Sequence, residues 1–400
     1  MNKIKAPQKK ITKPSYYDAF HCIASECEDN CCMGWHVDID EKTYHKYKTI
    51  EDPELKTLVR KSLRQNEEMI APEINFGKVK LTKSQNCAFL DEKRLCKIQK
   101  KYGETYLSNV CTLFPRIVNR VNNHLELSLS PACPEAVRQF LFEEEGITFI
   151  KYEAPFQMNL LTYDVNEKDK QYKRTPVANL SKINQTCIEI LKDRTLIFSK
   201  RLYKLGEFIE HLCHSEEAAT SRLIYAASPD FETGNTRFLS PQQKSVSDFT
   251  NVIYKTMAIE KTVVSERYLA FYHQAQTFWS LSIDKQESAY HAYDTFFDDH
   301  AYVFENYFVN LAYRNIFPFT EADDIFDAYM LFVVRYLMVQ HDLIGIAAKE
   351  PLTKAIVTAY FQSYSKAIEH HQYFYSVLLQ ALRQRQMNTW AFIKRINIID

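Results

Sequence analysis

The sequence predicts a mainly α-helical protein, in which a small cysteine-rich mixed α/β metal-binding module is followed by an all-helical domain. Eight of the ten cysteines lie between residues 22 and 133, among short stretches that alternate apolar and polar residues. From residue 135 onward helical periodicity dominates, apart from a short β-like stretch at 147–152. Only 7 of the 400 residues are glycine, whereas glycine makes up roughly 7% of an average chain. This scarcity of glycine also favours helices. We therefore expect a cysteine-cluster module at 1–150 and a helical domain at 151–400.

Local patterns predict the elements of the module. Alternation predicts strands, an aspartate before a periodic stretch predicts the start of a helix, and Asn-Asn between two alternating stretches predicts a hairpin. The expected elements are a flexible basic arm at 1–15, a strand at 35–40, helices from 40 and from 52 to about 68, a β segment at 73–81, a helix at 97–110 broken near Gly103, and a hairpin at 116–129 around Asn122-Asn123.

The second domain is expected to consist of aromatic-rich helices joined by polar loops. Side chains at helical spacing in 287–319 are interpreted mainly as core packing, with a cation–π cage for a lysine as the alternative. The predicted helical stretches are 179–213, 245–278, 287–316, 322–346 and 351–396, with polar loops near 164–178 and 227–244.

Composition excludes several classes of function. Lys+Arg and Asp+Glu both number 50, so no bulk charge would attract nucleic acid or an anionic membrane. The first 17 residues lack the apolar core of a signal peptide, and no apolar run is long enough to span a bilayer, which predicts a cytoplasmic protein. No Gly-x-Gly pair occurs, which excludes the Rossmann fingerprint and, by the same reasoning about the loop, the usual doubly wound S-adenosylmethionine site.

The cysteines are candidate metal ligands because a reducing compartment disfavours structural disulfides. A zinc site needs four N/S ligands and a [4Fe–4S] cluster usually needs four thiolates, so eight cysteines can satisfy either. Adjacent Cys31 and Cys32 are expected to point apart and to serve different roles. Cys187 and Cys213 are interpreted as core residues. Radical S-adenosylmethionine enzymes carry the signature Cys-x3-Cys-x2-Cys. Cys27 and Cys31 match its first two cysteines, but Gly34 occupies the third position, so the signature is not complete.

Several strings in both predicted domains are specific enough to compare with known families. The strings in the module are Phe20-His-Cys22-Ile-Ala-Ser-Glu-Cys27-Glu-Asp-Asn-Cys31-Cys32-Met-Gly-Trp35, Cys87-Ala-Phe-Leu-Asp91, Leu95-Cys96-Lys-Ile-Gln99, Tyr106-Leu-Ser, Cys111-Thr-Leu-Phe-Pro-Arg116 and Leu129-Ser-Pro-Ala-Cys133-Pro-Glu-Ala136. The second domain contains Glu305-Asn-Tyr307…Asn310…Phe317-Pro-Phe319. Together these strings closely resemble the flagellin lysine-N-methylase family, which is related to small cysteine-cluster proteins thought to bind zinc or iron–sulfur, and the resemblance covers most of the chain.

The resemblance implies methylation of lysine side chains on bacterial flagellin, with S-adenosylmethionine as donor and a [4Fe–4S] cluster held by cysteines, zinc being the alternative. Catalytic residues are not assigned. We hypothesise that the donor site lies between the two domains, near Trp35, Arg116 and Arg120. The alternative function is a non-catalytic metal-binding redox or interaction module. The candidate ligands carried over from the family are Cys22, Cys27, Cys31, Cys32, Cys87, Cys96, Cys111 and Cys133.

Overall fold

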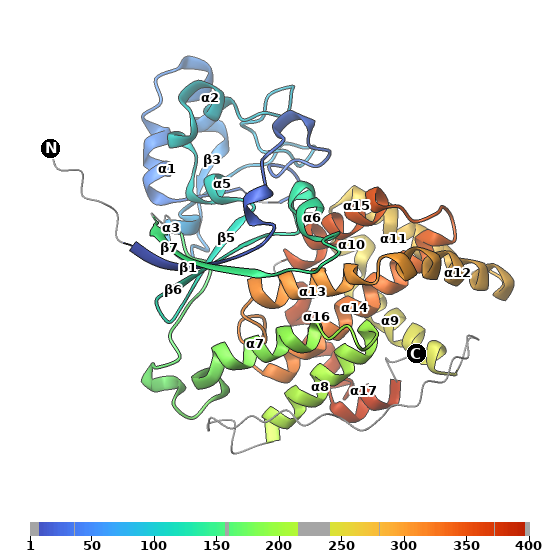
Figure 1. The fold of residues 1–400 in the computed structure, drawn as a ribbon. Coiled ribbons are helices and arrows are strands. Elements are labelled where there is room, and N and C mark those ends of the chain that lie inside the picture. Colours follow the sequence, from blue (N-terminus) through green and yellow to red (C-terminus); the bar gives the residue numbers. More distant parts are fainter. Residues whose placement is uncertain are drawn as a thin grey trace. The chain divides into compact units, whose positions relative to one another are not determined.

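The computed structural model describes residues 8–35, 37–156, 160–214, 241–279, 281–371 and 373–396. The chain divides into two compact units. Unit 1 comprises Met1–Val137 and Phe149–Asp164, and unit 2 comprises Arg138–Thr148 and Val165–Asp400. Strands in the described residues all lie at or before Val165, and helices predominate after it (Figure 1). The prediction of a mainly helical protein with a small sheet region toward its N-terminus is confirmed.

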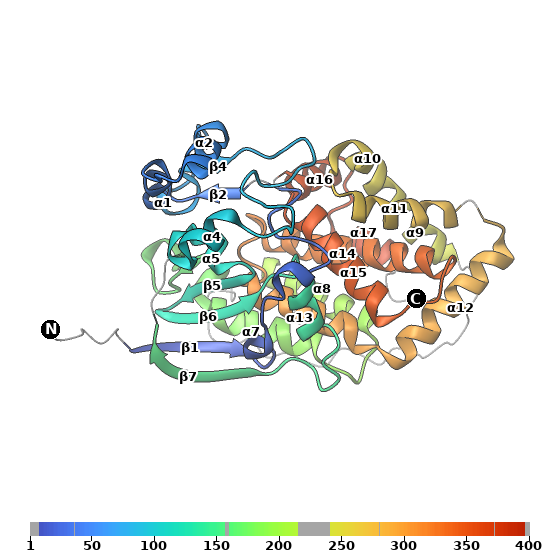
Figure 2. The same cartoon turned by 90° about the horizontal axis from the view of Figure 1, so that it is seen from above.

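The larger sheet of unit 1 has five strands within the described part of the chain. Their order is β7-β1-β6-β5-β8, and Figure 2 shows β5, β6, β1 and β7 side by side. The strands are β1 (Gln8–Pro14), β5 (Arg116–Val121), β6 (His124–Leu129), β7 (Phe149–Pro155) and β8 (Asp164–Val165).

The N-terminal segment is a strand from residue 8, so the expected flexible arm is wrong for 8–14. β1 runs antiparallel to β7 and parallel to β6, and these neighbours satisfy its backbone N–H and C=O groups. Ile11 is fully buried and packs with Val118, Leu125 and Leu127. The pairing with β6 joins residues more than a hundred positions apart, which no local pattern in residues 1–15 indicates.

The predicted hairpin is confirmed as β5 and β6. Asn122 and Asn123 both have positive φ, 51° and 64°, and Val121 pairs with His124 across the turn. Two consecutive residues with positive φ are typical of the type I′ turn, whose twist matches that of the strands it joins.

A smaller sheet of unit 1 has the order β2-β4-β3 in the described residues and carries short helices. Asp40 and Asp52 begin α1 and α2 as predicted, since their carboxylates accept the N–H groups of Thr43 and Leu55. The elements are β2 (Val37–Ile39), α1 (Glu41–Lys48), α2 (Pro53–Ser62), β3 (Leu63–Gln65), α3 (Pro72–Asn75), β4 (Gly77–Val79), α4 (Lys97–Tyr102) and α5 (Asn109–Leu113). Helix α6 (Pro134–Phe140) follows β6 in the chain, and the division between the two units falls within it.

Two boundaries in this region differ from the prediction. The second helix ends at Ser62 rather than near 68, because Leu63 pairs with Val79 and the chain continues as β3. The predicted β segment 73–81 begins as helix α3 and becomes a strand only at Gly77. A Cβ on Gly77 would lie 2.5 Å from Cδ2 of Tyr44, so glycine permits this close packing of strand on helix.

Unit 2 is built around α14 (Ile325–Ala347), against which α8, α9, α11, α12 and α16 pack. This helix is long and apolar enough to cross a membrane, but 94% of its most apolar window is buried inside the protein. The other elements are α7 (Leu180–Leu191), α8 (Phe198–His214), α9 (Pro241–Met257), α10 (Ile259–Thr262), α11 (Glu266–Phe278), α12 (Ile283–Asp299), α13 (Tyr302–Arg314), α15 (Lys354–Tyr364), a π turn (Ser365–Glu369), α16 (Phe374–Gln384) and α17 (Trp390–Ile396).

Most of the predicted helical stretches are broken by turns. The stretch 179–213 divides into α7 and α8, and 245–278 divides at Ala258, which has a φ of 47°. The loop predicted at 227–244 lies outside the described residues as far as 240, and 241–244 belong to α9. The aromatic side chains of α13 that follow Tyr302 are buried, which confirms their interpretation as core packing.

Candidate functional site

Cysteine side chains from distant parts of the sequence meet in unit 1. Cys87 is buried in the core of the smaller sheet, and Cys32, Cys96 and Cys111 pack against the same core. The Cys87 N–H donates to the Cys32 carbonyl at 2.8 Å, and a β-bridge joins Leu90 to Cys96. The loop 87–96 therefore folds back on itself as two short arms and brings its terminal cysteines to the same region.

Cys31 is the common neighbour of this group. We call the five residues Cys31, Cys32, Cys87, Cys96 and Cys111 the cysteine cluster. Burial is the main reason that the pKa values of Cys87 and Cys111 rise to about 12, and the charges of neighbouring cysteines, including Cys31, raise them further. The side chains whose pKa is raised by a charge at Cys31 are Cys27, Cys32, Cys87, Cys96, Cys111 and Cys133. All ten cysteines lie in described residues, and none of them forms a disulfide. Cys187 is buried as predicted, whereas Cys213 is exposed, so its interpretation as a core residue is wrong.

The expectation that Cys31 and Cys32 point apart is wrong. Their sulfur atoms lie 3.9 Å apart, because the two residues sit in a turn and not in an extended segment. Asn30 holds the turn, since its side-chain oxygen accepts the Cys32 N–H at 2.8 Å and its amide donates to the Arg94 carbonyl at 2.6 Å. The two sulfur atoms are thus close enough to contact the same bound metal centre.

Backbone and hydroxyl donors are directed at several cluster sulfurs. The N–H groups of Ile98 and Gln99, at the start of α4, lower the pKa of Cys96, although burial outweighs them. The Ser108 hydroxyl does the same for Cys111. Such donors stabilise thiolates and surround sulfur ligands in metal sites. Thiols with such donors are of the chemical type that binds a thiophilic metal or an iron–sulfur cluster.

The arrangement of side chains does not itself form a metal site. Within the described ranges no group of three or more His, Cys, Asp or Glu side chains could hold a metal ion as placed. Cys22 is exposed, whereas Cys87 and Cys133 are buried. The predicted set of eight ligands therefore stays a prediction.

Trp35, Arg116 and Arg120 all lie in unit 1. The Trp35 indole N–H donates to the Cys31 carbonyl at 2.6 Å, so Trp35 borders the cysteine cluster. The Arg116 guanidinium lies 5.0 Å from the centre of the Phe20 ring. Arg120 donates to both carboxylate oxygens of Asp164, with Nε 2.7 Å from Oδ1. Arg120 already has an anionic partner, and the predicted role of the three residues in binding the methyl donor stays a prediction.

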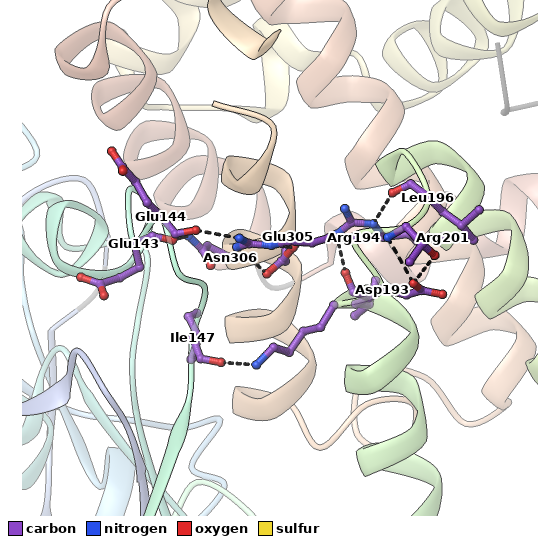
Figure 3. A network of polar contacts seen from close by, with 12 residues as sticks. Glu143, Glu144, Ile147, Asp193, Arg194, Leu196, Arg201, Glu305 and Asn306 are labelled. Atoms are coloured by element: carbon purple, nitrogen blue, oxygen red, sulfur yellow. Dashed lines mark hydrogen bonds and ion pairs between the residues drawn. The ribbon is translucent and has the colours of Figure 1, made fainter. Parts of the chain in front are cut away.

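In unit 2, buried ion pairs anchor the segment 138–148 (Figure 3). The Glu305 side chain is 1% exposed and accepts from Nε and Nη2 of Arg194, at 2.9 and 3.0 Å, and from Nη1 of Arg201, at 2.8 Å. The Asn306 amide donates to the Leu141 and Glu143 carbonyls. Glu305 and Asn306, singled out in sequence, therefore hold the fold of this unit.

A second buried carboxylate, Glu369, lies in the π turn after α15. Arg314 and Arg335 pair with it at 3.2 and 3.6 Å, and the Tyr307 and Ser365 hydroxyls donate to it. These cations and donors outweigh burial and hold the pKa of Glu369 below its usual value. Tyr307 belongs to the same sequence string as Glu305.

A third buried carboxylate, Asp342 in α14, has a different environment. It is fully buried and accepts from the hydroxyls of Tyr254, Tyr268 and Tyr360, while Nδ1 of His341 lies 3.3 Å from its Oδ1. Sequence reasoning missed this group. The available signal was an adjacent histidine and aspartate inside a long apolar helix, where polar side chains need a reason to be buried.

Comparison with known proteins reveals related sequences. The FliB lysine N-methylase C-terminal domain matches residues 184–396, more than half of the chain. Curated proteins named lysine-N-methylase from Salmonella typhimurium and Salmonella choleraesuis are each 28% identical over 231 residues, covering 54% of this chain and 52% of theirs. The flagellar biosynthetic protein FliU of Salmonella muenchen is 34% identical over 141 residues, covering 34% of this chain and 80% of FliU.

The chain spans about half the length of the two lysine-N-methylases that it matches. No solved structure matches it significantly. The matched segment 184–396 contains all three buried carboxylates described above, Glu305, Asp342 and Glu369.

Proposed function

Because the chain belongs to the FliB lysine N-methylase family, we propose that it transfers methyl groups from S-adenosylmethionine to lysine side chains of flagellin. The observation that carries this proposal is the match over 184–396, which contains the helical core around α14. Similarity to two proteins named lysine-N-methylase supports the reaction, and similarity to a flagellar protein supports the substrate.

The chemistry sets clear demands on such an enzyme. A lysine amine attacks a sulfonium methyl group only when it is neutral, aligned and shielded from water. Direct displacement needs no metal. The polar groups of unit 2 are buried among aromatic side chains, an environment that disfavours a charged amine without a partner.

We further propose that the cysteine cluster binds a [4Fe–4S] centre, with zinc as the alternative. We take Cys31, Cys32, Cys87, Cys96 and Cys111 as its ligand candidates, because Cys32, Cys96 and Cys111 pack against the core that contains Cys87 and the sulfur atoms of Cys31 and Cys32 lie 3.9 Å apart. A bound cluster would supply soft, redox-active iron, and zinc would supply a closed structural link. Either would tie the loop 87–96 to the turn that contains Cys31 and Cys32.

The experiment is to incubate purified protein with flagellin and S-adenosylmethionine and to measure the mass of intact flagellin. We expect mass increases in multiples of one methyl group, located on lysine, and a higher unfolding temperature of the protein when S-adenosylmethionine is present. A reaction without the protein is the control. Unchanged flagellin mass and an unchanged unfolding temperature would instead favour the non-catalytic metal-binding or interaction module.

The metal is identified separately, on protein purified without oxygen. Broad absorption in the visible range, with about four irons per chain, would establish a [4Fe–4S] centre. Colourless protein that contains zinc would make the cysteine cluster a structural site.

A further inference from the structure

Asp342 differs from the other buried carboxylates of unit 2 because it has no arginine or lysine partner in the described residues. Glu305 and Glu369 each pair with two arginines. Among the described residues, the basic group that lies beside Asp342 is His341. Burying a carboxylate away from water is unfavourable, and here tyrosine hydroxyls offset that cost in place of a cation.

The hydroxyls come from different helices and surround the carboxylate. Tyr254 of α9 donates to Oδ1 at 2.5 Å, whereas Tyr360 of α15 and Tyr268 of α11 donate to Oδ2 at 2.9 and 3.3 Å. Burial, and then the Asp342 charge, raise the pKa of all three phenols well above the usual value. They therefore remain protonated donors, and the carboxylate is held in one orientation.

His341 faces the carboxylate with Nδ1, which lies 3.3 Å from Oδ1 of Asp342. This geometry places the proton of the neutral ring on Nδ1 and leaves a lone pair on Nε2. Nε2 is buried, and among the described residues it has no hydrogen-bond partner. The Asp342–His341 pair thus resembles the orienting pairs in which a carboxylate fixes the tautomer of a histidine base.

Aromatic rings form the surroundings of His341. The Trp279 ring stacks on the imidazole, with centroids 4.4 Å apart and an interplanar angle of 22°, and the Tyr254 ring lies 5.1 Å away. The indole N–H of Trp279 also lacks a partner within the described chain. Trp279 is half-buried, so it is the member of the group nearest to solvent. Aromatic faces beside a buried acceptor suit an organic cation that can donate N–H groups.

We propose that His341, oriented by Asp342, receives the ammonium group of the lysine side chain that is to be methylated, beside the half-buried ring of Trp279. This inference rests on the proposed function. Nε2 takes one proton from the lysine ammonium, which leaves a neutral amine and an imidazolium that the Asp342 carboxylate stabilises. The amine lone pair then forms the N–C bond to the methyl group of a sulfonium donor, the C–S bond breaks, and its electron pair remains on the sulfur of the thioether product.

The test uses a variant that separates the two nitrogens of His341. In His341→Asn the amide can still donate to Asp342, but the acceptor at Nε2 is lost. The probes are Nα-acetyl-lysine amide and Nα-acetyl-norleucine amide, which lacks only the amino group, and binding to the full chain is measured by calorimetry. The matched control is His273→Asn, on α11, where the side chain is 56% exposed.

We expect wild-type protein and His273→Asn to bind the lysine probe and not the norleucine probe. We expect His341→Asn to bind the lysine probe with an affinity that is lower by about tenfold or more. Equal binding by His341→Asn and wild type, or no preference for lysine over norleucine, would overturn the inference. Binding of trimethylsulfonium in preference to the lysine probe would also overturn it, since the cation would then be that of the donor.

Two further measurements separate misfolding and failure of the broader proposal from failure of this inference. If His341→Asn does not fold, Trp279→Phe tests the same site at its half-buried edge and is expected to weaken binding of the lysine probe. If wild-type protein methylates flagellin and His341→Asn retains the full rate, the inference alone fails. If wild-type protein binds the lysine probe but transfers no methyl group, the proposed function fails and the lysine site stands.

Discussion

Replacing Glu305 by glutamine tests the buried ion pairs that anchor the segment 138–148. The Glu305 and Arg201 side chains are 1% and 6% exposed, so the substitution leaves the Arg201 guanidinium buried without its anion. Breaking one side of a buried pair typically costs about 3–5 kcal/mol. The Arg194 side chain is 44% exposed and can turn to water, so its loss of the same partner adds little. We therefore expect Glu305→Gln to lower the free energy of unfolding of unit 2 by about 3–5 kcal/mol.

The assay is urea unfolding followed by tryptophan fluorescence in a Trp35→Phe background. The two remaining tryptophans, Trp279 and Trp390, both lie in unit 2, so the signal reports this unit alone. With a slope of about 2–3 kcal/mol per molar urea, the expected loss shifts the midpoint down by about 1–2.5 M.

Arg194→Met is the matched control for Glu305→Gln. It removes the exposed partner and keeps the buried pair of Glu305 with Arg201, so we expect a loss of about 1 kcal/mol or less. If the two variants unfold at the same urea concentration, the buried pair is not the stabilising contact, and the reasoning from burial is wrong.

Three other predictions concern unit 1. Burial raises the pKa of Glu126 from 4.5 to about 7, so its carboxyl contributes stability that is fully present below pH 4.5 and is lost as the pH rises through 7. Glu126→Gln should remove roughly 3 kcal/mol of this pH dependence of the free energy of unfolding. The measurement is unfolding at about pH 5 and pH 8. Because φ is 64° at Asn123, Asn123→Gly should stabilise the protein by a few tenths of a kcal/mol, and Asn123→Ala should destabilise it by about 1 kcal/mol. Thermal unfolding measures both changes, and a higher unfolding temperature for the alanine variant than for the glycine variant would contradict the turn. Cys87→Ser should lower bound metal at least severalfold in elemental analysis, whereas Cys187→Ser, a buried cysteine of unit 2, should not; equal metal content in both would exclude Cys87 as a ligand.

The sequence by itself determined those features of this protein whose signals are local. Helical periodicity identified the predominantly helical second half, the Asn122-Asn123 pair identified a hairpin, and Asp40 and Asp52 marked the starts of two helices. Each of these signals acts within a few residues, through backbone conformation or a hydrogen bond to the next turn. The family was also recognisable, because the order of cysteines and the string from Glu305 to Phe319 are properties of the sequence alone.

The tertiary structure alone decided the features that depend on distant partners. The segment 8–14 is a strand because β6 and β7 lie beside it, although its own residues suggested a flexible arm. Cys31 and Cys32 face the same way because a turn held by Asn30 places them so.

The buried carboxylates show most clearly that a local stretch of sequence does not reveal its distant partners. Glu305 finds its arginines more than a hundred residues away, and Asp342 collects hydroxyls from α9, α11 and α15. A charged residue in a helix carries no mark of its partner, since the partner is chosen by helix packing and the burial that packing imposes. For this reason the crowding of eight cysteines between residues 22 and 133 could indicate a shared role, whereas the Asp342–His341 pair emerged only when the helices were assembled.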